Sequence, residues 1–553
     1  MGPPRRAGFA AVFPAVVVAV AAALAAGCSG PPAQGISTGQ HGSGSHGPGQ
    51  RGSSQAGALP FPATENRAGG TWHWYITHLG SPGAIEGFAD RVSVLPGQPF
   101  RLYVSTRAAS FHVQAFRMGW YSGARARQVW ASGRVAGRVQ RPRRISRATR
   151  MVIAPWRPSL TVSTTGWPPG AYLLRLDAAS GAQRYVPITV RSPSTAGKVV
   201  LVLGVTTWQA YNLWGGHDLY DGPQGFSDRS YEVSFDRPYA GNGAVLFLAF
   251  DQPPIALAER TAGVPLAYET DTDIAAHPGL LYGARAVISL GHDEYYSASM
   301  RRALLDARNA GTNLAFLGAN AMYWHIRLAS SPLGPGRVVI CYKVASLDPM
   351  HGKNNAATTQ NWRDPPDPRP ESVITGVFYE CNPVSAPYVV FDPKNWIFAG
   401  TRVRKGTAFP GLVGPEYDRV NPAVPFPRPL EVLAHSPLVC DGVHSHSDSA
   451  YYTVTSGAGV FAAGTMRWVC AMRVPHCGYG VGRAARSFVE KATQNLLRAF
   501  AAGPAGRAHP ARGTWPPSGP SAGRRSREPS GDGGDEATCH PAEEARCGSV
   551  LAT

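Results

Sequence analysis

The amino-acid sequence predicts a two-part fold, in which an all-β, immunoglobulin-like sandwich is followed by a doubly wound α/β domain. Two observations predict it. Between residues 71 and 190, short stretches alternate apolar with polar side chains, which is typical of strands buried on one face. After residue 198, apolar residues run continuously and helical stretches separate the runs, as expected for a parallel sheet covered on both faces.

The first part, residues 63–196, contains about seven short strands over about 120 residues, and this spacing favours a sandwich. A Pro96-Gly97 turn separates two of them. Strands are expected at 91–94, 100–104, 111–117, 159–163, 171–176 and 184–191.

The second part, residues 197–503, is predicted to be the α/β domain. Continuous apolar runs at 199–203, 285–290 and 312–317 predict strands buried on both faces. Apolar residues between Ser297 and Asn309 are spaced for one face of a helix, and a second helix is expected at 484–500. Residues 345–425 are rich in Pro, Asp and Asn, so we interpret them as a long insertion.

The first 28 residues are typical of the signal peptide of an exported lipoprotein. Arg5 and Arg6 precede an apolar run, and small residues lead to Cys28, the expected lipid attachment point. An uncleaved transmembrane anchor is the alternative, because the run is long enough to span a bilayer. Both interpretations put the bulk of the chain outside the cytoplasm, held at the outer face of the cell membrane.

Low-complexity segments flank the body of the chain. Residues 29–62 consist largely of Gly, Ser, Pro, Gln and His, and are expected to form a disordered tether. Residues 504–553 are rich in Pro, Gly, Arg and Ser, and are expected to form a disordered tail.

Net charge and cysteine content limit which partners and which cellular compartment we expect. The net charge is +18, but the arginines that supply most of it are scattered, so nucleic acid is not an expected partner. The chain has eight cysteines, and an exported protein can form disulfides, although sequence alone determines neither their pairing nor the oligomeric state.

Three polar and aromatic segments follow the expected parallel strands. They are 207–212, 291–297 and 318–324. Ligands of open α/β sheets bind beyond the carboxyl ends of the strands, so these segments are the candidate site.

A nucleophile mechanism is not expected there. The expected α/β domain has no GxSxG or GxCxG motif, and none of the three segments contains a cysteine. Ser297 is better interpreted as a helix N-cap. His292 and Glu294 are two residues apart and would point the same way in an extended turn. The alternative is an ordinary helix N-terminus, where an acidic residue is favoured by the helix dipole.

Several stretches together resemble the large, catalytic subunit of N,N-dimethylformamidase. The likeness spans roughly residues 70–500, with its motifs in the family's order. It implies a β-sandwich followed by a glutamine-amidotransferase-like domain and a mononuclear iron held by two tyrosines and one glutamate. The stretches are Ile85-Glu86-Gly87-Phe88, Phe116-Arg117-Met118-Gly119-Trp120-Tyr121, Trp208 to Tyr211, Gly291 to Ser297 and Gly457 to Trp468.

The resemblance also implies the iron ligands. The glutamate corresponds to Glu294 in His-Asp-Glu-Tyr, and one tyrosine to Tyr211 in Trp-Gln-Ala-Tyr-Asn. The second tyrosine corresponds to Tyr172 in Gly-Ala-Tyr-Leu-Leu-Arg. His292 is implied as the catalytic neighbour that moves a proton toward the leaving amine. Phenolate and carboxylate are hard oxygen donors, which suit ferric iron.

We therefore expect an iron-dependent hydrolase of a small, secondary or tertiary amide, anchored outside the cytoplasm. The family's characterised enzymes carry a further N-terminal domain that this sequence does not show, so dimethylformamide itself is not implied as the substrate. A surface-anchored binding module for cell wall or carbohydrate, which keeps the fold without catalysis, is the alternative.

Overall fold

The computed structural model describes residues 61–473 and 477–513. The expected signal peptide with Cys28, the tether up to residue 60 and the tail beyond residue 513 lie outside the described residues. In the described part of the chain, no helix is both long enough and apolar enough to cross a membrane.

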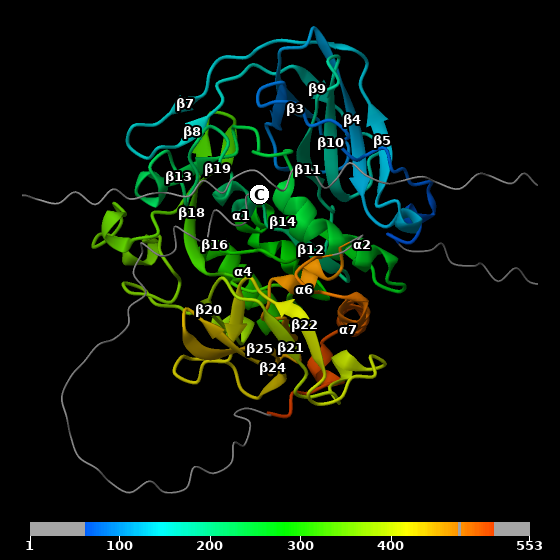
Figure 1. Cartoon of the computed structure of the whole chain (residues 1–553), viewed down its shortest axis with the longest axis vertical. Coiled ribbons are helices and arrows are strands. Elements are labelled where there is room, and N and C mark those ends of the chain that lie inside the picture. The colour runs from blue at the N-terminus through cyan, green and yellow to red at the C-terminus, as the bar shows by residue number, and fades with distance from the viewer. Residues whose placement is uncertain (1–60, 474–476, 514–553) are drawn as a thin grey trace, which may run out of the picture. The chain divides into compact units, whose positions relative to one another are not determined.

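Two β-sheets form the N-terminal part (Figure 1). The three-stranded sheet has the order β1 (Ile85–Ala89), β3 (Phe100–Thr106), β9 (Leu160–Val162). The six-stranded sheet has the order β2 (Ser93–Val94), β11 (Gln183–Val190), β10 (Gly170–Ala178), β4 (Ser110–Met118), β5 (Ala126–Ala131), with β6 (Val135–Ala136) also on β4. A separate ribbon joins β7 (Arg144–Ile145) to β8 (Val152–Ile153).

Strand β10 is buried on both faces, unlike the half-buried strand that the sequence predicts. Leu174 and Leu176 belong to the apolar cluster that the two sheets share. Leu173, on the opposite face, belongs to the cluster of the second part. Successive side chains of a strand point to opposite faces, so one strand contributes to both cores.

A seven-stranded mixed sheet forms the centre of the second part. Its first five strands are mutually parallel, and its last two are antiparallel to their neighbours. The order is β14 (Leu266–Thr270), β12 (Val199–Leu203), β15 (Ala286–Ser289), β17 (Asn313–Phe316), β26 (Gly459–Ala462), β25 (Val443–Thr453), β24 (Leu430–Cys440).

Helices cover both faces of this sheet, as the continuous apolar runs predict. Val199, Leu201 and Leu203 of β12 pack in one cluster, together with residues of α2 (Gln252–Arg260) and α7 (Arg483–Ala502). Val200 and Val202 pack in the other, together with α3 (Asp271–Ala276) and α4 (Ala298–Asn309). The strand therefore needs apolar side chains at every position.

The segment expected as an insertion, 345–425, is folded. It contains α5 (Ser372–Thr375) and two small sheets, which pair β20 (Phe378–Cys381) with β23 (Tyr417–Arg419) and β21 (Ala386–Val389) with β22 (Ala408–Val413). A four-stranded sheet precedes it, in the order β13 (Glu232–Ser234), β19 (Gly334–Ile340), β18 (Trp324–Ser331), β16 (Tyr295–Ser297).

Two disulfides join Cys381 to Cys440 and Cys470 to Cys477. Cys470 is the last residue of α6 (Arg467–Cys470). Disulfides persist in oxidising compartments, so the two bonds indicate a protein that folds outside the cytoplasm.

The ordered body extends further than the sequence predicts, because residues 504–513 are packed rather than disordered. The Tyr451 hydroxyl donates to the His509 carbonyl at 2.9 Å, and the Arg512 N–H donates to Glu431 Oε1 at 2.6 Å. Composition alone indicated a tail from residue 504, but tertiary hydrogen bonds hold its first ten residues.

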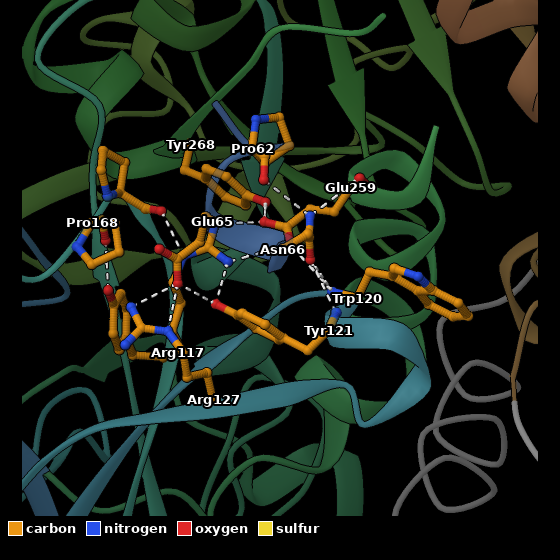
Figure 2. Close-up of polar contacts among 12 residues, drawn as sticks. Pro62, Glu65, Asn66, Arg117, Trp120, Tyr121, Arg127, Pro168, Glu259 and Tyr268 are labelled. Atoms are coloured by element: carbon orange, nitrogen blue, oxygen red, sulfur yellow. Dashed lines mark hydrogen bonds and ion pairs between the residues drawn. The ribbon is translucent and has the colours of Figure 1, made fainter. Parts of the chain in front are cut away.

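A buried ion pair connects the two parts (Figure 2). Arg117 of β4 contacts Glu259 of α2 at 2.5 Å, and both side chains are fully buried. The Tyr268 hydroxyl of β14 also donates to Glu259, at 2.5 Å. Gly119 makes room for this carboxylate, since a Cβ there would lie 2.1 Å from Glu259 Oε2. The Arg-Met-Gly motif of the sequence thus serves this contact.

Strands β11 and β12 belong to different sheets, which agrees with a change of architecture near residue 196. The described residues nevertheless belong to one compact unit, so the division into two domains stays a prediction.

Candidate active site

The candidate site lies where the strand order of the seven-stranded sheet reverses. The chain passes from β12 to β14 on one side and then to β15 on the other side of β12. The loops that leave β12 and β15 therefore diverge and open a crevice at the carboxyl ends of the strands. Tyr211 follows β12, Glu294 follows β15 and Asn320 follows β17.

Two tyrosines line one side of the crevice. Tyr211 caps the C-terminus of α1 (Val205–Ala210). A backbone hydrogen bond of 3.0 Å from the Leu219 N–H to the Ala210 carbonyl brings Tyr220 beside it. The two rings stack with centroids 4.5 Å apart, and their hydroxyl oxygens lie 3.0 Å apart.

Glu294 receives hydrogen bonds at both carboxylate oxygens. Tyr220 donates to Oε1 and Tyr211 donates to Oε2, each at 2.8 Å. Trp324 Nε1 and Asn320 Nδ2 donate to Oε1 at 2.8 Å and 3.1 Å. Glu294 is therefore not a helix cap. That place belongs to Ser297, whose hydroxyl accepts from the Met300 N–H as the sequence predicts.

His292 lies against the same carboxylate, with its Nε2 3.4 Å from Glu294 Oε2. The extended turn thus points both side chains the same way, as expected from their spacing. The turn is tightly packed, because a Cβ at Gly318 would lie 2.1 Å from the Gly291 carbonyl oxygen.

A buried lysine adds positive charge. Lys343 Nζ donates to the Tyr295 hydroxyl at 2.7 Å. It also lies 3.5 Å from the centre of the Tyr220 ring and 3.6 Å from that of Trp324. Cation–π contacts of this kind are strongest where water is excluded.

Burial and charge set the protonation of the site. Burial and the Glu294 charge raise the pKa of both Tyr211 and Tyr220 well above its ordinary value. Burial alone would also raise the pKa of Glu294, but His292 and Lys343 hold it below its ordinary value. The protein by itself therefore presents two neutral phenols to one carboxylate.

Several buried polar atoms of the site have no hydrogen-bond partner among the described residues. His292 Nδ1 and Asn320 Oδ1 are among them. Buried polar groups are nearly always satisfied, and exceptions call for a ligand, an ion or a catalytic role. Both atoms belong to side chains that also contact Glu294.

The segment 345–425 also reaches the site. Asp418 accepts the Asn320 N–H at 2.8 Å, and the charge of Glu416 acts on both Tyr211 and His292. Asn320 has a left-handed backbone conformation, with φ of 56°, and its N–H makes this hydrogen bond to Asp418.

The structure brings Tyr211, Glu294 and His292 together but does not bring Tyr172 to them. The Tyr172 hydroxyl donates to the Pro168 carbonyl at 2.5 Å, and its ring stacks on Trp167 within the sandwich core. Tyr220, rather than Tyr172, lies beside Tyr211 and Glu294. Sequence reasoning missed Tyr220 because the loop after α1 has no strand or helix period that would predict its orientation.

A mainly apolar cavity of about 220 Å³ adjoins the tyrosine pair. Its walls include Tyr211 and Tyr220 together with Trp208, Leu246 and Phe247. Small-molecule sites combine such apolar walls with a few convergent polar groups.

The donor set fits a hard metal ion. Two phenol oxygens and one carboxylate converge within hydrogen-bond distance of one another. Oxygen donors of this type suit ferric iron rather than soft ions.

Comparison with known proteins identifies one family. The family described as "N,N-dimethylformamidase beta subunit-like, C-terminal" matches residues 112–480. No curated protein matches the chain. Among solved structures, a Paenibacillus cycloisomaltooligosaccharide glucanotransferase aligns at 9% identity over 44% of this chain and 28% of that chain, with a TM-score of 0.14. That score is too low to support a common fold.

Proposed function

The chain belongs to the N,N-dimethylformamidase beta subunit-like family, and from this membership we propose that it is an iron-dependent hydrolase of a small, secondary or tertiary amide. One observation carries the proposal. The hydroxyls of Tyr211 and Tyr220 converge on the Glu294 carboxylate at 2.8 Å each, at the reversal point of the sheet. This is the donor set that the family resemblance implies, with Tyr220 in place of Tyr172.

Tyr211, Tyr220 and Glu294 would hold the iron. Bound ferric iron would supply Lewis acidity, which polarises an amide carbonyl and makes water more acidic. The raised phenol pKa values mean that both tyrosines keep their protons until a cation replaces them. Metal binding would therefore release protons from the site.

His292 is the group best placed to move a proton. Its Nε2 faces Glu294, and its Nδ1 has no partner in the described part of the chain. The neighbouring carboxylates of Glu294 and Glu416 favour its protonated form and raise its pKa, against the opposing effect of burial. A protonated imidazole can donate to the leaving amine of an amide.

The cavity beside the tyrosine pair supports an apolar substrate. Trp208, Leu246 and Phe247 offer apolar contacts to the alkyl substituents of an amide. An N-alkylated amide would place these substituents in the cavity, next to the residues that would hold the iron.

The proposal also covers the folds of the two parts of the chain and the location of the protein. The shared apolar cluster of the N-terminal sheets supports an immunoglobulin-like sandwich, and the doubly covered parallel strands support a glutamine-amidotransferase-like domain. The two disulfides support an exported enzyme, which Cys28 would anchor by a lipid at the outer face of the cell membrane.

Iron content and tyrosine substitutions test the proposal. Wild-type protein produced with ample iron should contain about one iron per chain and show phenolate-to-iron absorption in the visible range. Tyr211→Phe and Tyr220→Phe should each weaken or abolish this band, whereas Tyr172→Phe should retain it. Tyr172 is the matched control, because it is a buried tyrosine that donates its hydroxyl elsewhere.

His292→Gln separates metal binding from catalysis. It should keep the iron band but release amine from N-alkylated formamides and acetamides about 10²- to 10⁴-fold more slowly than wild type, the usual contribution of a general acid. Wild-type protein that stays iron-free after growth with ample iron would contradict the proposal. It would favour the surface-anchored binding module instead.

A further inference from the structure

A second group of potential metal ligands lies on the hairpin of β24 and β25, at the edge of the seven-stranded sheet. Strand β25 contains the sequence His444-Ser445-His446-Ser447-Asp448. Alternate residues of a strand share a face, so the two histidines and the aspartate project from the same side of the ribbon. Ser447 points the other way and donates to the Gly464 carbonyl.

Strand β24 adds a third ligand to this face. His435 is directly opposite Asp448 in the antiparallel register. His435 Nδ1 lies 2.8 Å from Asp448 Oδ1, and His446 Nε2 lies 3.3 Å from Asp448 Oδ2. One ligand atom of each residue can be chosen so that all three lie within 4.8 Å of one another.

We propose that His435, His446 and Asp448 bind a divalent transition-metal ion, Zn²⁺, and that this ion links β24 to β25. The site shares no residue with the tyrosine–glutamate centre and does not depend on the proposed hydrolase activity.

The spacing agrees with zinc coordination. Bonds of about 2.0–2.2 Å in a tetrahedron put neighbouring ligand atoms about 3.3 Å apart. The two histidines lie 2.8 Å and 3.3 Å from the two carboxylate oxygens of Asp448, and the three donors lie within 4.8 Å of one another, so a modest side-chain adjustment would bring them around one ion. Two imidazoles with one carboxylate are a common zinc ligand set.

The surroundings hold the aspartate and leave access from solvent. Asp448 is fully buried, and its Oδ2 also accepts the Val420 N–H at 2.9 Å, which orients the carboxylate. The side chains of His435 and His446 are 28% and 22% exposed, so an ion can reach them. His444 and His446 line an open hollow, from which His444 or water can complete the coordination.

A hydrogen-bonded ion pair without metal is the competing explanation. Arg419 of β23 interacts electrostatically with Asp448, which disfavours a cation there, but its guanidinium is already paired with Glu380 at 2.8 Å. An ion pair does not need a further histidine on the same face of β25, and His444, two residues before His446, favours metal binding.

Zinc titration of the full-length protein tests the site. Protein stripped with a chelator is titrated with Zn²⁺ against a chromophoric competitor, and Co²⁺ is used as a spectroscopic substitute. Wild type and Glu294→Gln should both bind one Zn²⁺ that His435→Ala and His446→Ala lose. The zinc affinity of each alanine variant should fall by more than the factor of about 10 to 100 that is typical when a hydrogen-bond partner outside the coordination shell is lost. His112→Ala is the control, because His112 is exposed on β4.

Protection of the wild-type protein gives a second measurement, should a variant fail to fold. Zn²⁺ should protect His435 and His446, but not His112, from acylation by diethyl pyrocarbonate, as read by peptide mass spectrometry. Equal zinc affinity in wild type and in both alanine variants, or equal acylation with and without Zn²⁺, would overturn the proposal. Loss of zinc binding in Glu294→Gln alone would assign the ion to the other site and would also overturn it.

Discussion

At the scale of single residues, burial determines which acidic side chains carry charge. Glu269 lies on β14, fully buried, and neither of its carboxylate oxygens has a hydrogen-bond partner among the described residues. Burial raises its pKa from 4.5 to about 8, and the charge of Asp273 acts in the same direction. The carboxyl is therefore neutral in the folded protein at mildly acidic pH.

This pKa predicts how stability depends on pH. Between about pH 4.5 and pH 8 the folded state keeps the Glu269 proton and the unfolded state loses it, so stability falls as pH rises through this window. The loss approaches about 1.4 kcal/mol per pH unit for one proton. Glu269→Gln removes the titration, and it should be more stable than wild type at pH 8 and lose less stability between pH 5 and pH 8.

Urea unfolding at several pH values measures both proteins. Asp418, whose pKa burial also raises to about 8, contributes with the same sign in both. The difference between the two curves therefore reports Glu269, and parallel curves would show that Glu269 does not titrate in this window.

At the scale of elements, single side chains connect strands and helices that are distant in the sequence. Arg117 of β4 and Glu259 of α2 form a fully buried pair, surrounded by the hydroxyls of Tyr121 and Tyr268 (Figure 2). Removing one member of such a pair leaves the other charge buried and unpaired.

We predict that Glu259→Ala lowers the free energy of unfolding by about 3–5 kcal/mol. The double variant Arg117→Met, Glu259→Leu should recover much of this loss, because no charge then stays buried. Glu490→Ala is the control: its ion pairs with Arg260 and Arg486 are partly exposed, so it should cost about 0–1 kcal/mol. A Glu259→Ala cost as small as that of the control would contradict the buried-pair argument.

At the scale of the whole molecule, two disulfides close loops of very different length. Cys381 and Cys440 are 59 residues apart, whereas Cys470 and Cys477 are 7 apart. The first bond joins the segment 345–425 to β24 and so connects regions that meet only in the folded protein.

Loop length predicts which of the two disulfides contributes more to stability. Loop-closure entropy gives about 4 kcal/mol for the longer loop and about 2 kcal/mol for the shorter one. Serine replacement of Cys381 and Cys440 together should therefore lower the thermal midpoint more than replacement of Cys470 and Cys477. Calorimetry of the two double variants and wild type measures this order, and the reverse order would show that the folded environment outweighs loop entropy here.

Local pattern in the sequence predicts most of the parallel strands and helices. The runs at 199–203 and 312–317 and the helix that Ser297 caps are formed as expected, because side-chain periodicity and capping act between near neighbours. The family resemblance is confirmed over residues 112–480. The His292–Glu294 pair is also local, since two residues of one extended turn must point the same way.

Only the tertiary structure decides which distant residues meet. Tyr172 and Tyr220 both lie within the residues that match the family, but β10 points the first into the sandwich core, whereas the Leu219–Ala210 hydrogen bond brings the second to Glu294. Packing likewise folds residues 345–425 and brings Asp418 to Asn320. No local period encodes these choices, because they depend on how the sheets and loops pack against one another.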